Sequence, residues 1–342
     1  MQKLYIIFSL IFINLNAQEP NTLGSLLYKE VTANVETEPV FAGDDAADDM
    51  CILENLNSPE KSLIISSDKK YGIIVYDLDG IKLYDYELGR INNVDVLPSK
   101  SIQNKYIVAG TNRTYNSIDI YLFNSKGKLE NLILRKEIPS LKDVYGVTFY
   151  RDEFNTYLFI SDKKGNVEQW SYNKDEVNSE IKFVRKLKFS SLVEGLVADE
   201  SKGKIYIGQE RKGIWELNAF PSLDSEKRLI FKKSKNFKPD FEGLALRDDG
   251  NGEGYLIASV QGSNGYLIID RKSLDAKIFF RIIDGDIIDG TTETDGIDVT
   301  SIKTPKFPNG FFIAQDDDND GLNQNFKLVD WNKILKWKKF SL

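Results

Sequence analysis

Short apolar strands recur along this chain at a nearly constant interval. Helical periodicity is almost absent, and the strands alternate with turns rich in Gly, Asn, Asp and Ser. The intervals between strand starts run from 43 to 56 residues, about one four-stranded propeller blade each. We therefore expect an all-β chain, a six-bladed β-propeller with four- to five-stranded antiparallel blades around a central channel. The six strands begin near Leu63, Tyr106, Tyr157, Ile205, Tyr255 and Phe311.

Polar side chains mark the same two places in each repeat. Two antiparallel strands joined by a hairpin bring the start of the first and the end of the second to one sheet edge. Blades around a common axis would gather these edges at one mouth of the channel, with basic groups from the first three repeats and mainly acidic groups from the rest. The strand ends carry Lys69, Arg113, Lys163, Glu210, Gln261 and Asp316, and the upstream series is Asp49, Asp95, Tyr145, Glu194, Glu242 and Asp295.

The absence of histidine narrows the chemistry that such a mouth can perform. The chain has no His and one Cys, which excludes a Ser-His-Asp triad, a His-activated cysteine, a His-bearing zinc site and internal disulfides. Clustered carboxylates need a cation, and oxygen-only ligands favour Ca²⁺. Facing Lys and Arg side chains suit phosphate oxygens. We expect a phosphate ester bound between cations and metal ions, with metal-bound water as the nucleophile.

An acidic turn near the C-terminus has part of a calcium-loop pattern. The run Asp316-Asp-Asp-Asn-Asp-Gly321 matches the opening half of an EF-hand loop. The twelfth position is Lys327, where an EF-hand requires a bidentate Glu. We therefore expect a calcium-binding loop completed by distant residues such as Asp289, and the alternative is a solvated acidic turn.

The N-terminus has the pattern of a secretory signal. Lys3 precedes the apolar run 4–13, which is too short to cross a bilayer, and Ala17 suits cleavage; the alternative is a buried first strand. We divide the chain into a signal peptide (1–17), a lead-in (18–35), one propeller domain (36–332) and a basic tail (333–342). The protein would then be exported, to the periplasm or the medium, without a transmembrane segment. The net charge of −7 disfavours a nucleic-acid partner, and we expect a monomer.

The chain resembles the β-propeller phytases, a family of calcium-dependent alkaline phytases. The matching motifs span about residues 36 to 331, and their order and spacing are similar to those of the family. They include Gly43-Asp-Asp-Ala-Ala-Asp-Asp49, Asn92-Asn-Val-Asp95, Thr111-Asn-Arg113, Asp143-Val-Tyr-Gly146, Asp240-Phe-Glu-Gly243, Asp289-Gly-Thr-Thr-Glu-Thr-Asp-Gly-Ile-Asp-Val299, Phe312-Ile-Ala-Gln-Asp316 and Asn323-Gln-Asn-Phe-Lys-Leu-Val329.

The resemblance implies a 3-phytase, which removes phosphate from myo-inositol hexakisphosphate (phytate) by attack of a calcium-bound water, with several structural and catalytic Ca²⁺ ions. It implies that Lys69, Lys70, Arg113 and Lys163 bind phosphate. The catalytic group would be Lys69, Arg113, Tyr145, Lys163, Glu194 and Glu210. The metal ligands at the cleavage site would be Tyr145, Glu194, Glu210, Asp240 and Glu242, with Glu36, Asp48 and Asp49 beside them. A structural calcium would be held by Asp289, Asp316, Asp318 and Asn319.

The sequence departs from the family pattern at two places. Met50-Cys51 stands where the family usually has Pro-Ala, so we expect altered packing and a buried thiol. Gln209 replaces a Glu next to Glu210, which would remove a negative charge near the site.

Two other functions are alternatives to a phytase: a calcium-dependent six-bladed lactonase or esterase, and a non-catalytic calcium-stabilised binding propeller.

Overall fold

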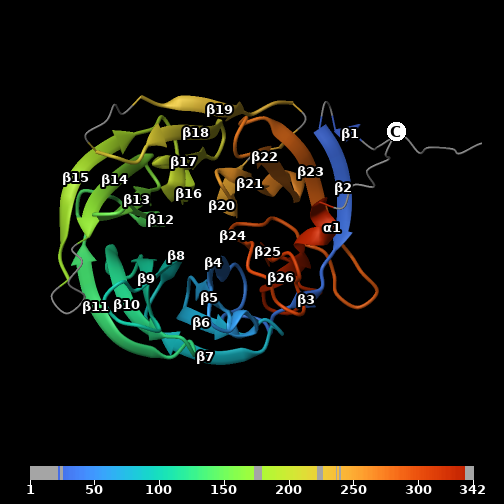
Figure 1. The fold of residues 1–342 in the computed structure, drawn as a ribbon, viewed down its shortest axis with the longest axis horizontal. Helices are drawn as coiled ribbons and strands as arrows, with labels where there is room; N and C mark the ends of the chain where they lie inside the picture. Colours follow the sequence, from blue (N-terminus) through green and yellow to red (C-terminus); the bar gives the residue numbers. More distant parts are fainter. Residues whose placement is uncertain are drawn as a thin grey trace, which may run out of the picture.

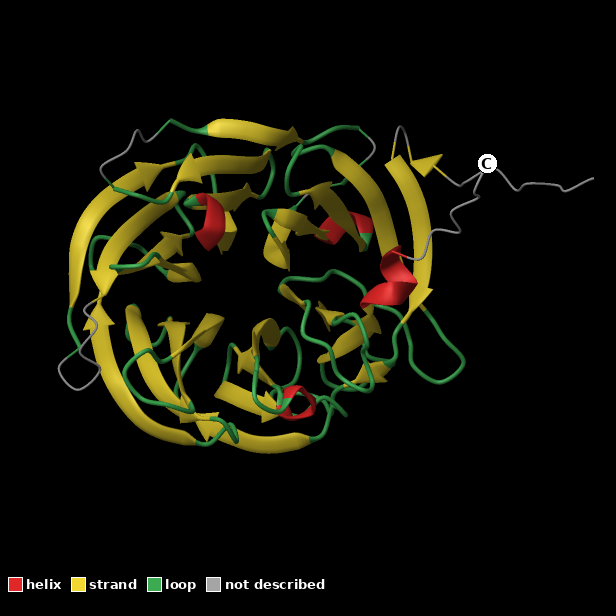
Figure 2. Cartoon of the chain, in the orientation of Figure 1, coloured by secondary structure: helices red, strands yellow, loops and turns green. Residues whose placement is uncertain are grey.

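Six sheets, antiparallel except for one parallel pair of strands, surround a central axis in the computed structural model of the chain (Figures 1 and 2). The structure describes residues 22–23, 26–172, 179–221, 226–235, 237–238 and 240–335. The predicted six-bladed propeller is confirmed. The predicted signal peptide, 1–17, and the tail beyond residue 335 lie outside the described residues.

The first four blades each consist of four consecutive strands, with the first strand next to the axis. Blade 1 contains β4 (Ala47–Leu53), β5 (Leu63–Asp68), β6 (Gly72–Tyr76) and β7 (Lys82–Glu87). Blade 2 contains β8 (Ile91–Pro98), β9 (Lys105–Asn112), β10 (Ser117–Asn124) and β11 (Leu129–Glu137). Blade 3 contains β12 (Val144–Arg151), β13 (Thr156–Asp162), β14 (Asn166–Tyr172) and β15 (Ile181–Lys188), and blade 4 contains β16 (Val193–Asp199), β17 (Lys204–Gln209), β18 (Gly213–Asn218) and β19 (Arg228–Lys232).

The N-terminal segment completes the last two blades. Blade 5 contains β20 (Phe241–Gly250), β21 (Glu253–Val260), β22 (Gly265–Asp270) and β23 (Ala276–Ile283), and β2 (Leu26–Thr32) pairs in parallel with β23. The short β1 (Thr22–Leu23) lies outside β2. Blade 6 contains β24 (Ile297–Thr300), β25 (Phe311–Asp316), β26 (Asn325–Asp330) and, as its fourth strand, β3 (Val35–Glu36). Because β3 and β26 come from opposite ends of the chain, their pairing closes the ring.

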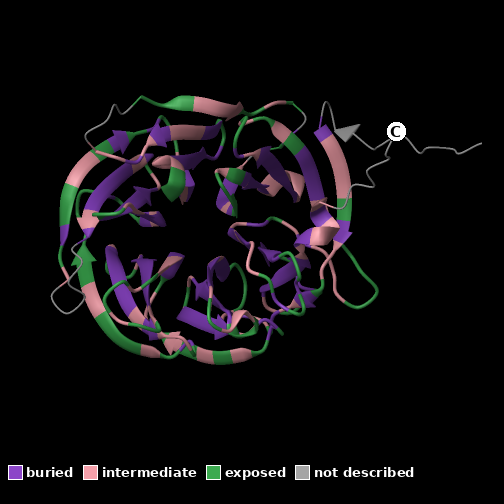
Figure 3. Ribbon diagram, in the orientation of Figure 1, coloured by how far each residue is buried: buried purple, intermediate pink, exposed green. Residues whose placement is uncertain are grey.

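The core is divided among the six contacts between neighbouring blades, and burial falls off toward the outer strands (Figure 3). Between blades 1 and 2, for example, Ile65 and Val75 pack against Val108 and Tyr121. Met50 is buried between blades 1 and 6, and Cys51 is a buried free thiol between blades 1 and 2. The expectation of a buried thiol is confirmed, and burial raises the pKa of Cys51 well above its usual value.

Helices are few among the described residues. They comprise α1 (Trp331–Leu335) and three single turns of 3₁₀ helix, at Pro59–Lys61, Glu200–Lys202 and Gln261–Ser263. Within the described part of the chain, none of these is long and apolar enough to span a bilayer.

Candidate active site

A bulge interrupts the innermost strand of five blades at the mouth of the channel. The register of the first strand slips over two residues in β4, β8, β12, β16 and β20. A bulge bends its strand and redirects the side chains there, so these residues leave the ladder at the channel mouth. In blade 6 the corresponding pair, Asp295-Gly296, directly precedes β24. We call the first residues of these pairs the mouth ring: Asp48, Asn92, Tyr145, Glu194, Glu242 and Asp295.

Glycine follows four members of the mouth ring because the next blade comes very close. A Cβ added at Gly195 would lie 2.0 Å from the carbonyl oxygen of Glu242, and one at Gly146 would lie 1.9 Å from that of Glu194. Gly296 bonds through its N–H to the carbonyl of Asp48 at 2.9 Å, which joins blade 6 to blade 1. The glycine that recurs after these mouth-ring residues thus reflects how tightly the inner strands approach.

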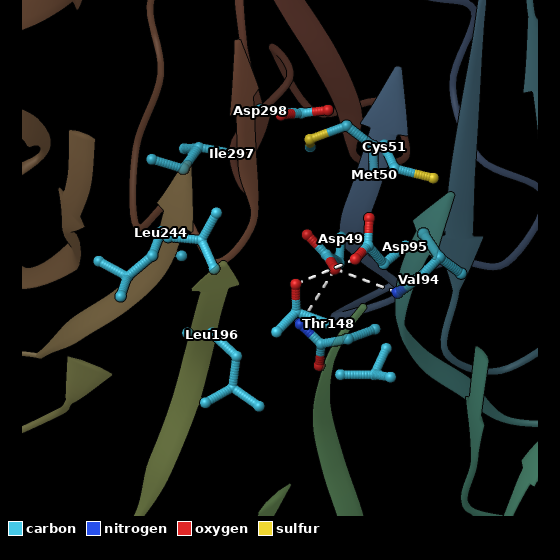
Figure 4. A pocket seen from close by; sticks show the side chains of 15 residues that line it. Asp49, Met50, Cys51, Val94, Asp95, Thr148, Leu196, Leu244, Ile297 and Asp298 are labelled. Atoms are coloured by element: carbon cyan, nitrogen blue, oxygen red, sulfur yellow. Dashed lines mark hydrogen bonds between the residues drawn. The ribbon is translucent and has the colours of Figure 1, made fainter. Parts of the chain in front are cut away.

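The sequence interpretation was wrong about the ring members of the first two blades. It chose Asp49 and Asp95, but the bulges place Asp48 and Asn92 in register with Glu194. Asp49 and Asp95 instead line a cavity of about 60 Å³ on the axis, together with Asp298 (Figure 4). Strand spacing alone does not locate a bulge, so it cannot distinguish Asp48 from Asp49 or Asn92 from Asp95.

Three glutamates form the densest part of the site. One carboxylate oxygen from each of Glu194, Glu210 and Glu242 lies within 4.8 Å of the others, and all three residues are buried. One oxygen of Glu194 and one of Glu242 have no hydrogen-bond partner. Burial, with repulsion from neighbouring carboxylates, raises the pKa of Glu194 and of Glu210 to about 7. Buried acceptors without hydrogen-bond partners and with raised pKa values suit a bound cation, so this cluster can hold a metal ion.

The remaining predicted cleavage-site ligands surround this cluster. The Tyr145 hydroxyl interacts with Glu194, and burial followed by the charge of Glu194 raises the pKa of Tyr145 well above its usual value. Asp240 lies beside Glu210, and its buried Oδ1 has no hydrogen bond and only a 3.6 Å ion pair with Arg211. Asp48 accepts a hydrogen bond from Asn92 at 2.6 Å. Asp49 turns away, because its carboxylate accepts hydrogen bonds from Asn93 and from the Val94 N–H, at 3.1 Å each. Glu36 also lies elsewhere, where it bonds to Lys327.

Lys69 links the two ends of the ring of blades. Its ammonium lies 2.8 Å from Asp48, 3.2 Å from Asp295 and 2.5 Å from the exposed carboxylate of Asp45. Burial opposes its charge, but Asp48 and Asp295 raise the pKa of Lys69 well above its usual value. Lys70 is more exposed and bonds to the Gly43 carbonyl at 2.6 Å. The structure therefore places Lys69 within the acidic region and Lys70 at its rim.

Arg113 and Lys163 form the basic side of the mouth. Arg113 donates to both carboxylate oxygens of Asp143, at 2.8 and 3.1 Å, and to Asn92 Oδ1 at 3.2 Å. The Lys163 ammonium lies 4.6 Å from the centre of the Tyr145 ring and 4.0 Å from Asp143. Because Asn92 also donates to Glu194 at 3.1 Å, a single side chain joins the basic and acidic sides.

Gln209 does not face the glutamates. Its amide donates to Ser190 and Ser191 at 2.9 and 2.7 Å and accepts from the Trp215 indole at 3.0 Å. The expected loss of charge beside Glu210 therefore falls outside the glutamate cluster.

A second acidic cluster lies beside the ring, between blade 6 and the loop before it. The buried Lys327 ammonium lies 2.8 Å from Glu36, 3.4 Å from Asp316 and 3.3 Å from Asn319 Oδ1, and it also contacts Asp289. The amide oxygen of Asn325 is buried without a hydrogen-bond partner, and the buried Oδ2 of Asp316 has only its 3.4 Å ion pair with Lys327, so this cluster also fits a cation.

The second cluster differs from the predicted structural calcium site in three respects. Glu36, expected beside Asp48, bonds here to Lys327 and Asn325. Asp318 is exposed and lines a cleft of about 370 Å³ with Asp289. Lys327, which ruled out an EF-hand, lies among the carboxylates, and Asn325 was missed because an isolated Asn gives no sequence signal.

Comparison with known proteins fits this geometry. The sequence profile of the phytase family matches residues 5–339. The chain is 40% identical over 326 residues to a 3-phytase of Bacillus subtilis (strain 168), which covers 90% of this chain and 85% of that protein. The chain is a member of the phytase family. The predicted family is thus confirmed, and hydrolysis of phytate is the activity that these matches support.

A solved structure of low sequence identity agrees with the fold of this phytase. A structural genomics protein of unknown function from Bacteroides thetaiotaomicron VPI-5482 superposes with a TM-score of 0.58 at 12% identity, covering 88% of this chain and 74% of the other. At that identity the likeness concerns the fold alone.

Proposed function

We propose that this phytase is a 3-phytase that hydrolyses phosphate monoesters of phytate, presented as its calcium complex, with Ca²⁺ ions held at the mouth ring. The observation that carries the proposal is the pair of buried carboxylate oxygens without hydrogen-bond partners on Glu194 and Glu242, close to the basic side chains of Arg113 and Lys163. Ca²⁺ prefers oxygen ligands, and no histidine is present to favour zinc. Glu194, Glu210, Glu242, Asp240 and Tyr145 would hold it.

The chain's own residues would divide the work between binding and orientation. Arg113 and Lys163 bind one phosphate group, and Lys69 and Lys70 bind phosphate oxygens on the other side of the mouth. The mouth ring directs its carboxylates toward the ester that these cations hold. When bound, Ca²⁺ would supply a water of lowered pKa and neutralise charge on the phosphoryl group. A second Ca²⁺ with a structural role would be held by Asp289, Asp316, Asn319 and Glu36, with Asp318 at its edge.

A phosphate-release assay tests this function. Phytate should release inorganic phosphate when Ca²⁺ is present, and a chelator should abolish the release. Glu194→Gln and Lys69→Ala should each lower turnover by about 10²-fold or more, since each removes a charge from a preorganised site. Glu180→Gln, on the outer face of blade 3, removes the same charge as Glu194→Gln and should have no effect. A chelator-resistant enzyme, or full turnover in both site variants, would refute the assignment.

The basic side chains at the mouth of the channel distinguish this function from the two alternatives. A neutral lactone gives Lys69, Arg113 and Lys163 no anionic partner, so a lactonase leaves them without a role. A binding propeller would hold phytate tightly and release no phosphate, which the same assay detects.

We further propose that the protein is exported after removal of residues 1–17 and acts as a monomer. N-terminal sequencing of the exported protein and light scattering test these two points.

A further inference from the structure

We propose that Asp143 determines substrate specificity: its carboxylate competes with phosphate for Arg113 and Lys163, and so disfavours ligands with one phosphate relative to polyphosphate esters. The inference rests on the proposed function, in which these two cations bind phosphate. It adds a residue whose task is selection between phosphate ligands.

Asp143 makes the contacts that a bound phosphate would make. Its two oxygens accept hydrogen bonds from Nε and Nη2 of Arg113 at 2.8 and 3.1 Å, the bidentate geometry in which guanidinium groups also bind phosphate. The same carboxylate lies 4.0 Å from the Lys163 ammonium. A phosphate that approaches both cations must therefore displace Asp143 or bind next to its negative charge.

The backbone holds this carboxylate in position. Asp143 has φ = 63°, the left-handed region that Asp and Asn enter more readily than other side-chain-bearing residues. The flanking N–H groups are both fixed, that of Lys142 by Asp162 at 3.1 Å and that of Val144 by Asn116 at 3.2 Å. The Asp143 side chain is 42% exposed and that of Arg113 15%, so the carboxylate covers a cation that is otherwise largely buried.

The cost of displacing Asp143 is the same for every ligand that displaces it, but a polyphosphate ester can also bind through Lys69 and Lys70 while Asp143 stays on Arg113, so the competition weighs most on a ligand with a single phosphate. Such a ligand has only the Arg113 and Lys163 contacts to offset the repulsion from Asp143. A polyphosphate ester also reaches Lys69 and Lys70, and contacts on one molecule reinforce one another through effective concentration. On the side of the mouth that carries Lys69 and Lys70, the exposed carboxylate of Asp45 lies 2.5 Å from Lys69 and that of Asp44 lies 3.7 Å from Lys70. Aspartates thus occupy both sides of the mouth, and a ligand with several phosphates is best able to replace them.

The test uses Asp143→Asn, which removes the charge while keeping a side chain that tolerates φ = 63°. The matched control is Glu180→Gln in the same blade, whose carboxylate pairs with Lys182 at 3.2 Å on the outer strand. The calcium-loaded full chain is titrated calorimetrically with phenylphosphonate, a probe with one phosphate-like group that cannot be hydrolysed as an ester. Turnover of p-nitrophenyl phosphate and of phytate is measured in parallel.

We expect Asp143→Asn to bind phenylphosphonate about 5–10-fold more tightly, the effect of one unit charge about 4 Å away where the dielectric constant is close to that of water, as suits a carboxylate that is 42% exposed. KM for p-nitrophenyl phosphate should fall by a similar factor with kcat little changed, and the preference for phytate should shrink accordingly. If Asp143 merely orients Arg113, the variant binds the probe more weakly. Weaker or unchanged binding overturns the inference. A wild-type protein that releases no phosphate from phytate would instead refute the proposed function, and the titration, which needs no turnover, would still test Asp143.

Discussion

Arg113 and Glu194 are held one side chain apart, because both bond to the amide of Asn92. Arg113 donates to Asn92 Oδ1 at 3.2 Å, and Asn92 Nδ2 donates to Glu194 at 3.1 Å and to Asp48 at 2.6 Å. Asn92 is fully buried, so these bonds form away from competing water. The amide fixes a cation at a set distance from two carboxylates, which a charged residue at this position could not do for both.

Asn92→Ala tests whether this amide positions Arg113, Asp48 and Glu194 for binding and turnover. The change removes an acceptor from Arg113 and donors from Asp48 and Glu194, leaving buried polar groups unpaired. We expect kcat/KM for phytate to fall by about 10–100-fold and calcium affinity to weaken, measured by phosphate release and calorimetry. Asn131→Ala, on the exposed outer strand of the same blade, serves as the control. An Asn92→Ala enzyme with unchanged calcium affinity and kcat/KM would contradict this role.

Calcium binding at the glutamates should release protons near neutral pH. The pKa values of Glu194 and Glu210 are raised to about 7, and a cation requires both carboxylates ionised. Calcium affinity should therefore rise between about pH 6 and 8 and then level off. Calorimetry in buffers of different ionisation enthalpy counts the protons, and Glu194→Gln should release fewer. Affinity independent of pH over this range would contradict the prediction.

The same pKa shifts set the pH dependence of the calcium-free protein. The folded chain binds these protons more tightly than the unfolded chain, whose glutamates titrate near 4.5. The free energy of unfolding should thus be highest below about pH 4.5 for these groups and fall as the pH rises to about 7. Saturating calcium should remove this decline, which chemical denaturation at several pH values would measure.

The strand repeat predicted where the site lies better than which residues form it. Spacing alone placed Glu194, Glu242 and Asp295 at one mouth, because blade symmetry converts sequence period into position. The spacing could not locate the bulges, and so Asp95 was chosen where Asn92 stands. Nor could it show that Asp143 lies against Arg113, since a turn's direction depends on local φ, or that Glu36 joins a blade formed by the other end of the chain.

Gly195→Ala tests the close approach of the inner strands. The added Cβ would lie 2.0 Å from the carbonyl oxygen of Glu242, a backbone atom that cannot move without shifting blade 5. We expect a loss of about 3 kcal/mol or more in the free energy of unfolding, at the upper end for single substitutions. Gly285→Ala, whose nearest neighbour would be 3.2 Å away in a loop, should cost much less. Equal stability of the two variants would show that the inner strands can move apart at this point at little cost in free energy.

Lys327→Met tests whether the second acidic cluster binds a cation beside its resident ammonium. Glu36, Asp289 and Asp316 carry three potential negative charges around one buried Lys327, so the cluster has charge left for a divalent ion. Removing one partner of a buried ion pair costs about 3–5 kcal/mol, because the remaining charges are left uncompensated. We therefore expect the calcium-free variant to lose about that much stability in urea denaturation.

Calcium should then restore much of the stability lost in Lys327→Met, because a divalent ion can compensate the same carboxylates. The gain on adding calcium should be larger in the variant than in the wild type. Lys306→Met, which removes a lysine paired with the exposed Asp79, controls for the loss of a surface charge and should leave both measurements nearly unchanged. If calcium stabilised wild type and Lys327→Met by the same amount, the ammonium and the metal would not share these ligands. The unpartnered amide oxygen of Asn325 would then have to be explained without a cation.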